Sequence, residues 1–64
     1  MMIYINNKTG QRYRLQAVGT DCTNVRDGTP VAVYCPEGDE FTVFVRDLSE
    51  FQVKFRPDET KSAN

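Results

Sequence analysis

Two cysteines and no histidine leave little catalytic or metal-binding chemistry in this 64-residue sequence. Cys22 and Cys35 lie thirteen positions apart, whereas a structural zinc site needs about four Cys, His or carboxylate ligands at short spacings. The missing histidine removes the commonest general base, and a reactive cysteine thiolate needs a cationic or helix-N-terminal neighbour. The sequence therefore predicts a protein that is not an enzyme and that holds no metal and no cofactor.

The acidic residues lie mostly where turns are expected, which favours a role in turn formation and solubility. They are Asp21, Asp27, Glu37, Asp39 and Glu40. The cluster at 37–40 lacks the regular oxygen ligands and the bidentate glutamate of a calcium loop. We therefore expect no cation site among them.

Charge and hydropathy exclude two further classes of protein. Eight basic and nine acidic residues give a net charge of −1, far from the strongly basic character of a dedicated nucleic-acid binder. No apolar run approaches the roughly 18 to 20 residues of a membrane span, and the first residues lack the pattern of a secretory signal. We expect a cytoplasmic protein, in the host cytoplasm if it is viral, with reduced thiols and no membrane partner.

Five short segments with alternating or β-branched residues predict an all-β domain. They span residues 2–6, 11–18, 30–35, 41–46 and 51–56. Asp47 and Glu50 have the spacing of a capping box, which predicts one short helical turn before the last strand. This order predicts either a small SH3-like five-stranded barrel or a strongly bent antiparallel sheet. The domain is expected to cover 1–56, and the tail 57–64, which has no large apolar residue, is expected to be disordered.

The alternation also assigns side chains to faces. In 11–18 we expect Tyr13, Leu15 and Ala17 to face the core, and in 51–56 we expect the same of Phe51, Val53 and Phe55. The connection 19–30 contains the turn dipeptide Asp27-Gly28, and it is either an irregular loop or a small hairpin. The hairpin at 30–46 has apolar residues on both faces, which predicts that something covers each of them.

Several of these residues together resemble a known pattern. They are Tyr4, Lys8-Thr9-Gly10, Tyr13, Val31, Val33, Tyr34, Val45-Arg46, Leu48 and Phe51. The series is similar to a family of short uncharacterised bacterial and phage proteins with the pattern Tyr, Gly, Tyr, Val-Tyr and Val-Arg-x-Leu-x-x-Phe, over residues 4 to 55. The resemblance implies a small SH3-like β domain of bacterial or phage origin and carries no activity with it. The chain departs from the pattern at Phe44, at Asp47 and in the loop 20–29.

Two surfaces are candidates for binding. The first is the second apolar face of the hairpin, where we expect Tyr4, Ala32, Tyr34 and Phe44. Aromatic residues are enriched in interface cores, so this face predicts a protein-binding site, together with Arg26 and Asp27 of the 19–30 loop. The alternative is that closure of the sheet buries the face as a second small core.

The second candidate surface is basic. It comprises Arg12 and Arg14 of segment 11–18 and Lys54 and Arg56 of segment 51–56, with Arg46 nearby. If these strands lie on one side, the cluster can contact phosphates. The alternative is a solvated strand face whose charges discourage edge-to-edge pairing.

These observations favour a protein-interaction module. We expect a small phage or bacterial accessory protein that binds and modulates a host protein, for example as an inhibitor of a defence system, or that self-associates as a homodimer. The alternative function is a small nucleic-acid-binding barrel that uses the basic face, which the near-neutral net charge disfavours.

Overall fold

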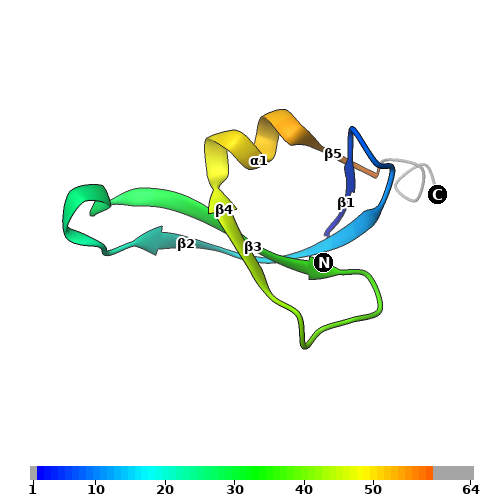
Figure 1. Cartoon of the computed structure of the whole chain (residues 1–64), viewed down its shortest axis with the longest axis horizontal. Coiled ribbons are helices and arrows are strands. Elements are labelled where there is room, and N and C mark those ends of the chain that lie inside the picture. The colour runs from blue at the N-terminus through cyan, green and yellow to red at the C-terminus, as the bar shows by residue number, and fades with distance from the viewer. Residues whose placement is uncertain (1, 59–64) are drawn as a thin grey trace.

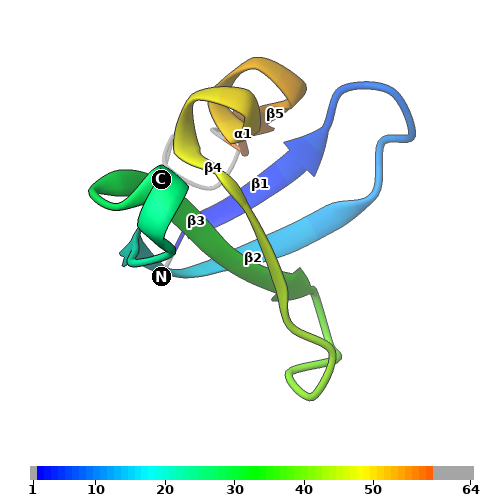
Figure 2. The same cartoon turned by 60° about the vertical axis from the view of Figure 1, so that its left-hand side comes forward.

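One antiparallel sheet with strand order β4-β3-β2-β1-β5 makes up most of the computed structural model, which describes residues 2–58 (Figure 1). The strands are β1 (Met2–Asn6), β2 (Arg12–Asp21), β3 (Thr29–Pro36), β4 (Phe44–Asp47) and β5 (Phe55–Pro57), with a 3₁₀ turn η1 (Asn24–Arg26) and one helix, α1 (Leu48–Lys54). The sheet bends strongly, and α1 crosses its concave side to join the edge strands β4 and β5 (Figures 1 and 2). The bent-sheet form of the predicted fold is confirmed.

The β2–β3 hairpin is the longest feature of the fold. Its two strands pair from Tyr13 opposite Pro36 to Asp21 opposite Thr29. The Gly28 amide donates to the Asp21 carbonyl at 2.9 Å, and Gly28 has a φ of 91° that other residues rarely adopt. The connection 19–30 is therefore the end of the β2–β3 hairpin and contains no separate small hairpin, and Figure 1 shows it projecting from the rest of the domain.

A bulge in β2 changes which side chains face the core. The pairing register shifts between Leu15 and Ala17, so one extra residue is inserted in β2 at that point. Tyr13 and Leu15 pack against the core as predicted. Ala17 is exposed, because beyond the bulge it lies opposite Val33 and away from the Tyr34 face, and its predicted core position is wrong.

The core is an aromatic cluster between the concave face of the sheet and α1. Its buried members are Ala32, Tyr34, Phe51 and Phe55, with Tyr4, Tyr13, Leu15 and Leu48 packed against them. The rings of Phe51 and Phe55 stack with centroids 4.4 Å apart. The Tyr34 centroid lies 5.0 Å from that of Phe51 and 5.3 Å from that of Phe55. Aromatic pairs at these distances stabilise a fold beyond the area they bury.

The predicted fifth strand over 51–56 is wrong, because most of it belongs to α1. Leu48, Phe51 and Phe55 have the i, i+3, i+7 spacing of one helix face, and all three pack in the core. Val53, which a strand would have buried, is 76% exposed. The helix extends over seven residues instead of one turn, and β5 begins only at Phe55.

The predicted capping box is also wrong, although the helix begins directly after Asp47 as expected. The Asp47 side chain makes no capping hydrogen bond and pairs with Arg26 instead. Glu50 pairs with Arg46, one turn earlier in the sequence. Both carboxylates are therefore used in ion pairs.

The ordered chain extends past the predicted domain end at Arg56. Pro57 completes β5, and the Asp58 amide donates to the Ile3 carbonyl at 2.9 Å. The Asp58 side chain is 3% exposed and lies 2.6 Å from the Arg12 guanidinium. The prediction of a disordered tail is wrong for these two residues, and its remainder, 59–64, lies outside the described residues.

Truncating the Phe51 ring tests the aromatic core. Phe51 is 1% exposed, so Phe51→Ala should lower the free energy of unfolding by about 3 to 5 kcal/mol, measured by urea denaturation. Val53→Ala, two residues away on the exposed side of α1, should change it by less than about 0.5 kcal/mol. Similar losses for both variants would contradict the helical assignment of this segment.

Candidate protein-interaction surface

The face predicted to bind a protein through Tyr34 is the core of the domain. Tyr34 is 4% exposed and Ala32 is fully buried, while the Tyr4 ring packs edge-on against Phe51 at 5.0 Å. The face is buried as a core, as in the alternative prediction, but the sheet does not close, and α1 covers the face instead. Tyr4 is half-buried, and Phe44 is the exposed one of the predicted residues on this face, at 40%.

The largest run of exposed apolar side chains lies on β4 and on the loop that precedes it. We call the four residues Phe41, Val43, Phe44 and Val45 the β4 apolar edge. They are 99%, 50%, 40% and 63% exposed, respectively. No charged residue lies between Phe41 and Val45, and Thr42 is the one polar residue in the run. Exposed apolar patches mark interaction sites.

The backbone of β4 adds hydrogen-bonding capacity to this surface. β4 pairs with β3, with Val45 opposite Val33 and Phe44 opposite Tyr34, and it is the last strand on its side of the sheet. An edge strand presents unpaired N–H and C=O groups to any extended segment that approaches. The other edge, β5, has only three residues and ends in Pro57, which has no N–H to donate.

The loop before β4 is held in an ordered turn by Asp39. Its carboxylate accepts hydrogen bonds from the Phe41 amide at 3.1 Å, from the Thr42 amide at 3.3 Å and from the Thr42 hydroxyl at 2.8 Å. The Thr42 hydroxyl is the main cause of the lowered pKa of Asp39. These contacts keep residues 41–43 out of the predicted strand, and they order the backbone at Phe41, which lowers the backbone part of the entropy lost on binding.

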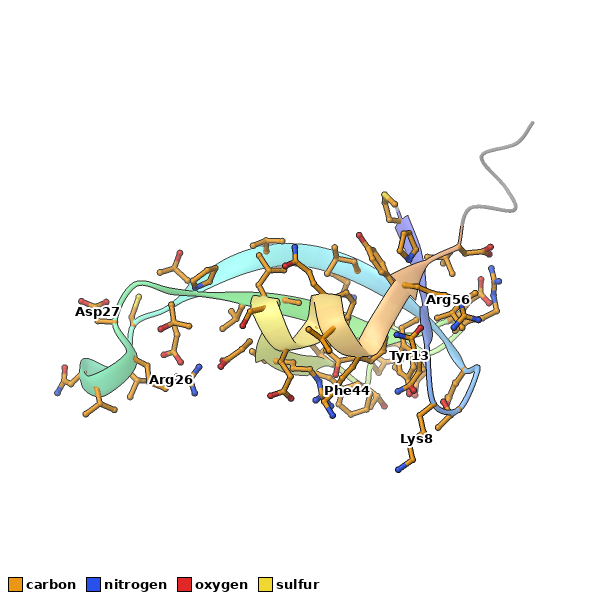
Figure 3. All side chains as sticks on the ribbon, turned by 90° about the horizontal axis from the view of Figure 1, so that it is seen from above. Lys8, Tyr13, Arg26, Asp27, Phe44 and Arg56 are labelled. Atoms are coloured by element: carbon orange, nitrogen blue, oxygen red, sulfur yellow. The ribbon has the colours of Figure 1, made fainter. Side chains whose placement is uncertain are left out.

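The two predicted binding residues on the hairpin tip, Arg26 and Asp27, lie far from Phe44 along the molecule (Figure 3). Arg26 lies 3.3 Å from Asp21 and also pairs with Asp47, so its guanidinium ties the tip to the start of α1. The residues predicted as one protein-binding set therefore occupy two separate surfaces.

Three of the four predicted nucleic-acid contacts do share one face of the sheet. Ile5 lies opposite both Arg12 and Arg56, and residues paired across a ladder point to the same side. Arg14, two positions from Arg12 in β2, has the same orientation. Lys54 lies on α1 instead.

Carboxylates neutralise much of this basic face. Arg12 lies 2.8 Å from Glu37 and 2.6 Å from Asp58. These two hydrogen bonds raise the pKa of Arg12, the one to Glu37 most strongly. Arg14 lies 3.4 Å from Glu40. The charge available for phosphate is consequently smaller than the sequence suggests.

Three other features bear on the chemistry of the chain. Cys22 is exposed, Cys35 is buried, and both are free. Within residues 2–58, no group of three or more His, Cys, Asp or Glu side chains is arranged to hold a metal ion. The helices in this part of the chain are too short and too polar to cross a membrane.

No protein-family model, curated protein or solved structure matches this chain. The function is therefore inferred from the surface itself. Sequence patterns identified Phe44 but missed Phe41, Val43 and Val45 as exposed residues. The available signal was the uncharged run between Glu40 and Arg46.

Replacing Thr42 tests the ordered turn. The pKa of Asp39 lies below its ordinary value of 3.8, so its carboxylate stabilises the fold above that pH, and the stabilisation is lost as the pH falls through the lowered pKa. In Thr42→Val we expect the pKa of Asp39 to rise toward 3.8, measured by NMR titration of the carboxyl carbons. The pKa of Asp21, lowered mainly by the Thr23 amide, should not move. An unchanged pKa of Asp39 would contradict the turn.

Proposed function

We propose that this chain is a non-enzymatic protein-interaction module that binds through the β4 apolar edge. The observation that carries the proposal is the uncharged run from Phe41 to Val45, which lies exposed at the start of the edge strand β4 and on the loop before it. The resemblance of the sequence to short bacterial and phage proteins supports an accessory role, in which the module binds and modulates a host protein or a further copy of itself.

The energetics of this surface favour protein over small-molecule recognition. Burying a valine or phenylalanine side chain contributes roughly 1.5 to 3 kcal/mol, and aromatic anchors supply much of the energy of protein interfaces. Phe41 and Val45 are 99% and 63% exposed and gain most from burial. An extended partner segment can in addition form main-chain hydrogen bonds with β4.

Affinity capture with matched variants tests the proposal. A tagged wild-type chain should retain a saturable partner from a lysate of its source or host, and Phe41→Ser should reduce the retained amount at least about tenfold, given that a buried aromatic anchor is worth 2 kcal/mol or more. Val53→Ser, whose side chain is 76% exposed on α1, is the control and should retain the partner.

Two capture results would reject this surface. One is equal retention by wild type and Phe41→Ser. The other is that Val53→Ser loses the partner while Phe41→Ser still retains it. Circular dichroism of each variant establishes that it is folded before the comparison is made.

A nucleic-acid interface over Arg12, Arg14 and Arg56 is the second candidate, because these arginines share one face of the sheet. Since Glu37 and Glu40 pair with Arg12 and Arg14, we expect no saturable binding of single-stranded RNA or DNA at about 50 mM salt. A fluorescence anisotropy titration measures this. Tight wild-type binding that Arg14→Ala weakens and that falls steeply with salt would favour the second candidate instead.

A further inference from the structure

We propose that the β4 apolar edge pairs with the same edge of a second copy of this chain, in an antiparallel two-fold contact centred on Phe44. The inference rests on the proposed function, since it uses the same surface, and it adds the identity of the partner and the register of the contact. The product is a dimer whose two five-stranded sheets continue into one another through β4.

The sequence around the start of β4 is self-complementary in this register. Val43-Phe44-Val45 reads the same in both directions. A two-fold antiparallel pairing about Phe44 therefore places Phe44 opposite the partner's Phe44 and Val43 opposite the partner's Val45. The three central cross-strand pairs are then apolar, and aromatic and β-branched pairs are the ones that stabilise antiparallel ladders. Farther out, Thr42 lies opposite the partner's Arg46 and Phe41 opposite the partner's Asp47.

The neighbouring registers place charges badly. A pairing centred on Val45 sets Val43 opposite the partner's Asp47 and Phe44 opposite the partner's Arg46. A pairing centred on Arg46 sets two guanidinium groups against each other, which is repulsive. A pairing centred on Val43 sets Phe44 opposite the partner's Thr42 and Asp47 opposite the partner's Asp39. Of these registers, the one centred on Phe44 sets the two Phe44 rings opposite each other and pairs Val43 with Val45.

The aromatic core reaches the surface at the centre of the proposed contact. The Phe44 ring lies 5.6 Å from that of Tyr34 and 6.4 Å from that of Tyr13, and Figure 3 shows Phe44 and Tyr13 close to one another. Because Phe44 is still 40% exposed, the cluster is incomplete on this side. The partner's Phe44 would cover it and continue the aromatic packing from one copy into the next.

The remaining strand edges are less suited to self-pairing. β5 is three residues long and ends in Pro57. Leu15 is the last residue of β2 that pairs with β1, so the rest of β2 has a free edge. This rest contains Gly19 and ends in Asp21. A contact from β4 to this part of β2 would be heterologous and would not close, whereas the two-fold β4 contact closes after two copies.

Size and charge also favour a second copy. Six hydrophobic residues are buried in the described part of the chain, and domains this small commonly add a subunit contact to a limited core. The net charge of −1 produces little repulsion between copies. The edge also lacks the lysine or proline that blocks pairing in many edge strands.

Analytical ultracentrifugation of the full chain tests the dimer. We expect a concentration-dependent species of twice the 7.3 kDa chain mass. Val45→Lys and Val43→Lys should each give a folded monomer, because they place a charge in the apolar ladder. Val53→Lys on α1 and Val18→Lys on the free part of β2 should remain dimeric, since both side chains are exposed away from β4.

Disulfide trapping tests the register, in a background in which the exposed Cys22 is replaced by serine. Phe44→Cys should form a covalent dimer on mild oxidation, because position 44 faces itself. Neither Val43→Cys nor Val45→Cys should form a covalent dimer when it is oxidised by itself. A mixture of the two variants should cross-link, because position 43 faces position 45 of the other copy. Self-linking of Val45→Cys with no mixed product would overturn the register.

The inference is overturned if the wild-type chain is a monomer at all accessible concentrations. It is also overturned if Val18→Lys dissociates the dimer and Val45→Lys leaves it intact. If the chain is monomeric but captures a different protein in a Phe41-dependent way, the inference fails and the proposed function stands. If it is monomeric and captures nothing, both fail.

Discussion

The contacts of the Tyr34 ring determine both the bend of the sheet and the position of α1. This ring contacts the rings of Tyr13, Phe51 and Phe55, with centroid distances of 5.0 to 5.6 Å. Its hydroxyl accepts a hydrogen bond from Arg46 Nε at 3.2 Å, so burial leaves no unpaired polar group. The sheet must curve to bring strands β2, β3 and β5 around this one side chain. Because the core uses this face of β3, the surface left for a partner is displaced to β4.

Ion pairs secure the ends of the elements around this core. Arg12 connects β2 to Glu37 after β3 and to Asp58 after β5. Arg26 connects the hairpin tip to Asp47 at the start of α1. Exposed pairs contribute little to stability, but they have a second effect here. Each carboxylate that pairs with a guanidinium neutralises its positive charge at the surface, which explains how a chain with several arginines on one side avoids a strongly basic face.

The sequence predicts the elements of this fold better than their boundaries. β1 matches its predicted range because the alternation there is bounded by a clear turn. The pattern Phe51, Val53, Phe55 fits a strand, yet Leu48, Phe51 and Phe55 fit a helix equally well. Packing against Tyr34, which a short window cannot show, decides between them. The bulge after Leu15 likewise depends on pairing with β3.

The candidate surface was predictable only in part for the same reason. The uncharged run 41–45 is visible in the sequence, but its exposure depends on β4 being an edge strand and on Asp39 holding Phe41 and Thr42 in a turn. Tyr34 and Phe44 look equivalent in an alternating pattern. They differ because β3 is central in its part of the sheet and β4 is at the edge.

The contrast between the two edges of the sheet connects the fold to the proposed role. An unprotected apolar edge exposes a protein to aggregation, and proteins commonly block such edges with short strands, charges or proline. This chain does so at β5, which is short and ends in Pro57. At β4 the start of the strand is left apolar, since Val43, Phe44 and Val45 are exposed there, and the charged residues Arg46 and Asp47 come only at its end. A small domain that protects one edge and leaves the other apolar has the asymmetry expected if the second edge is covered by a protein partner.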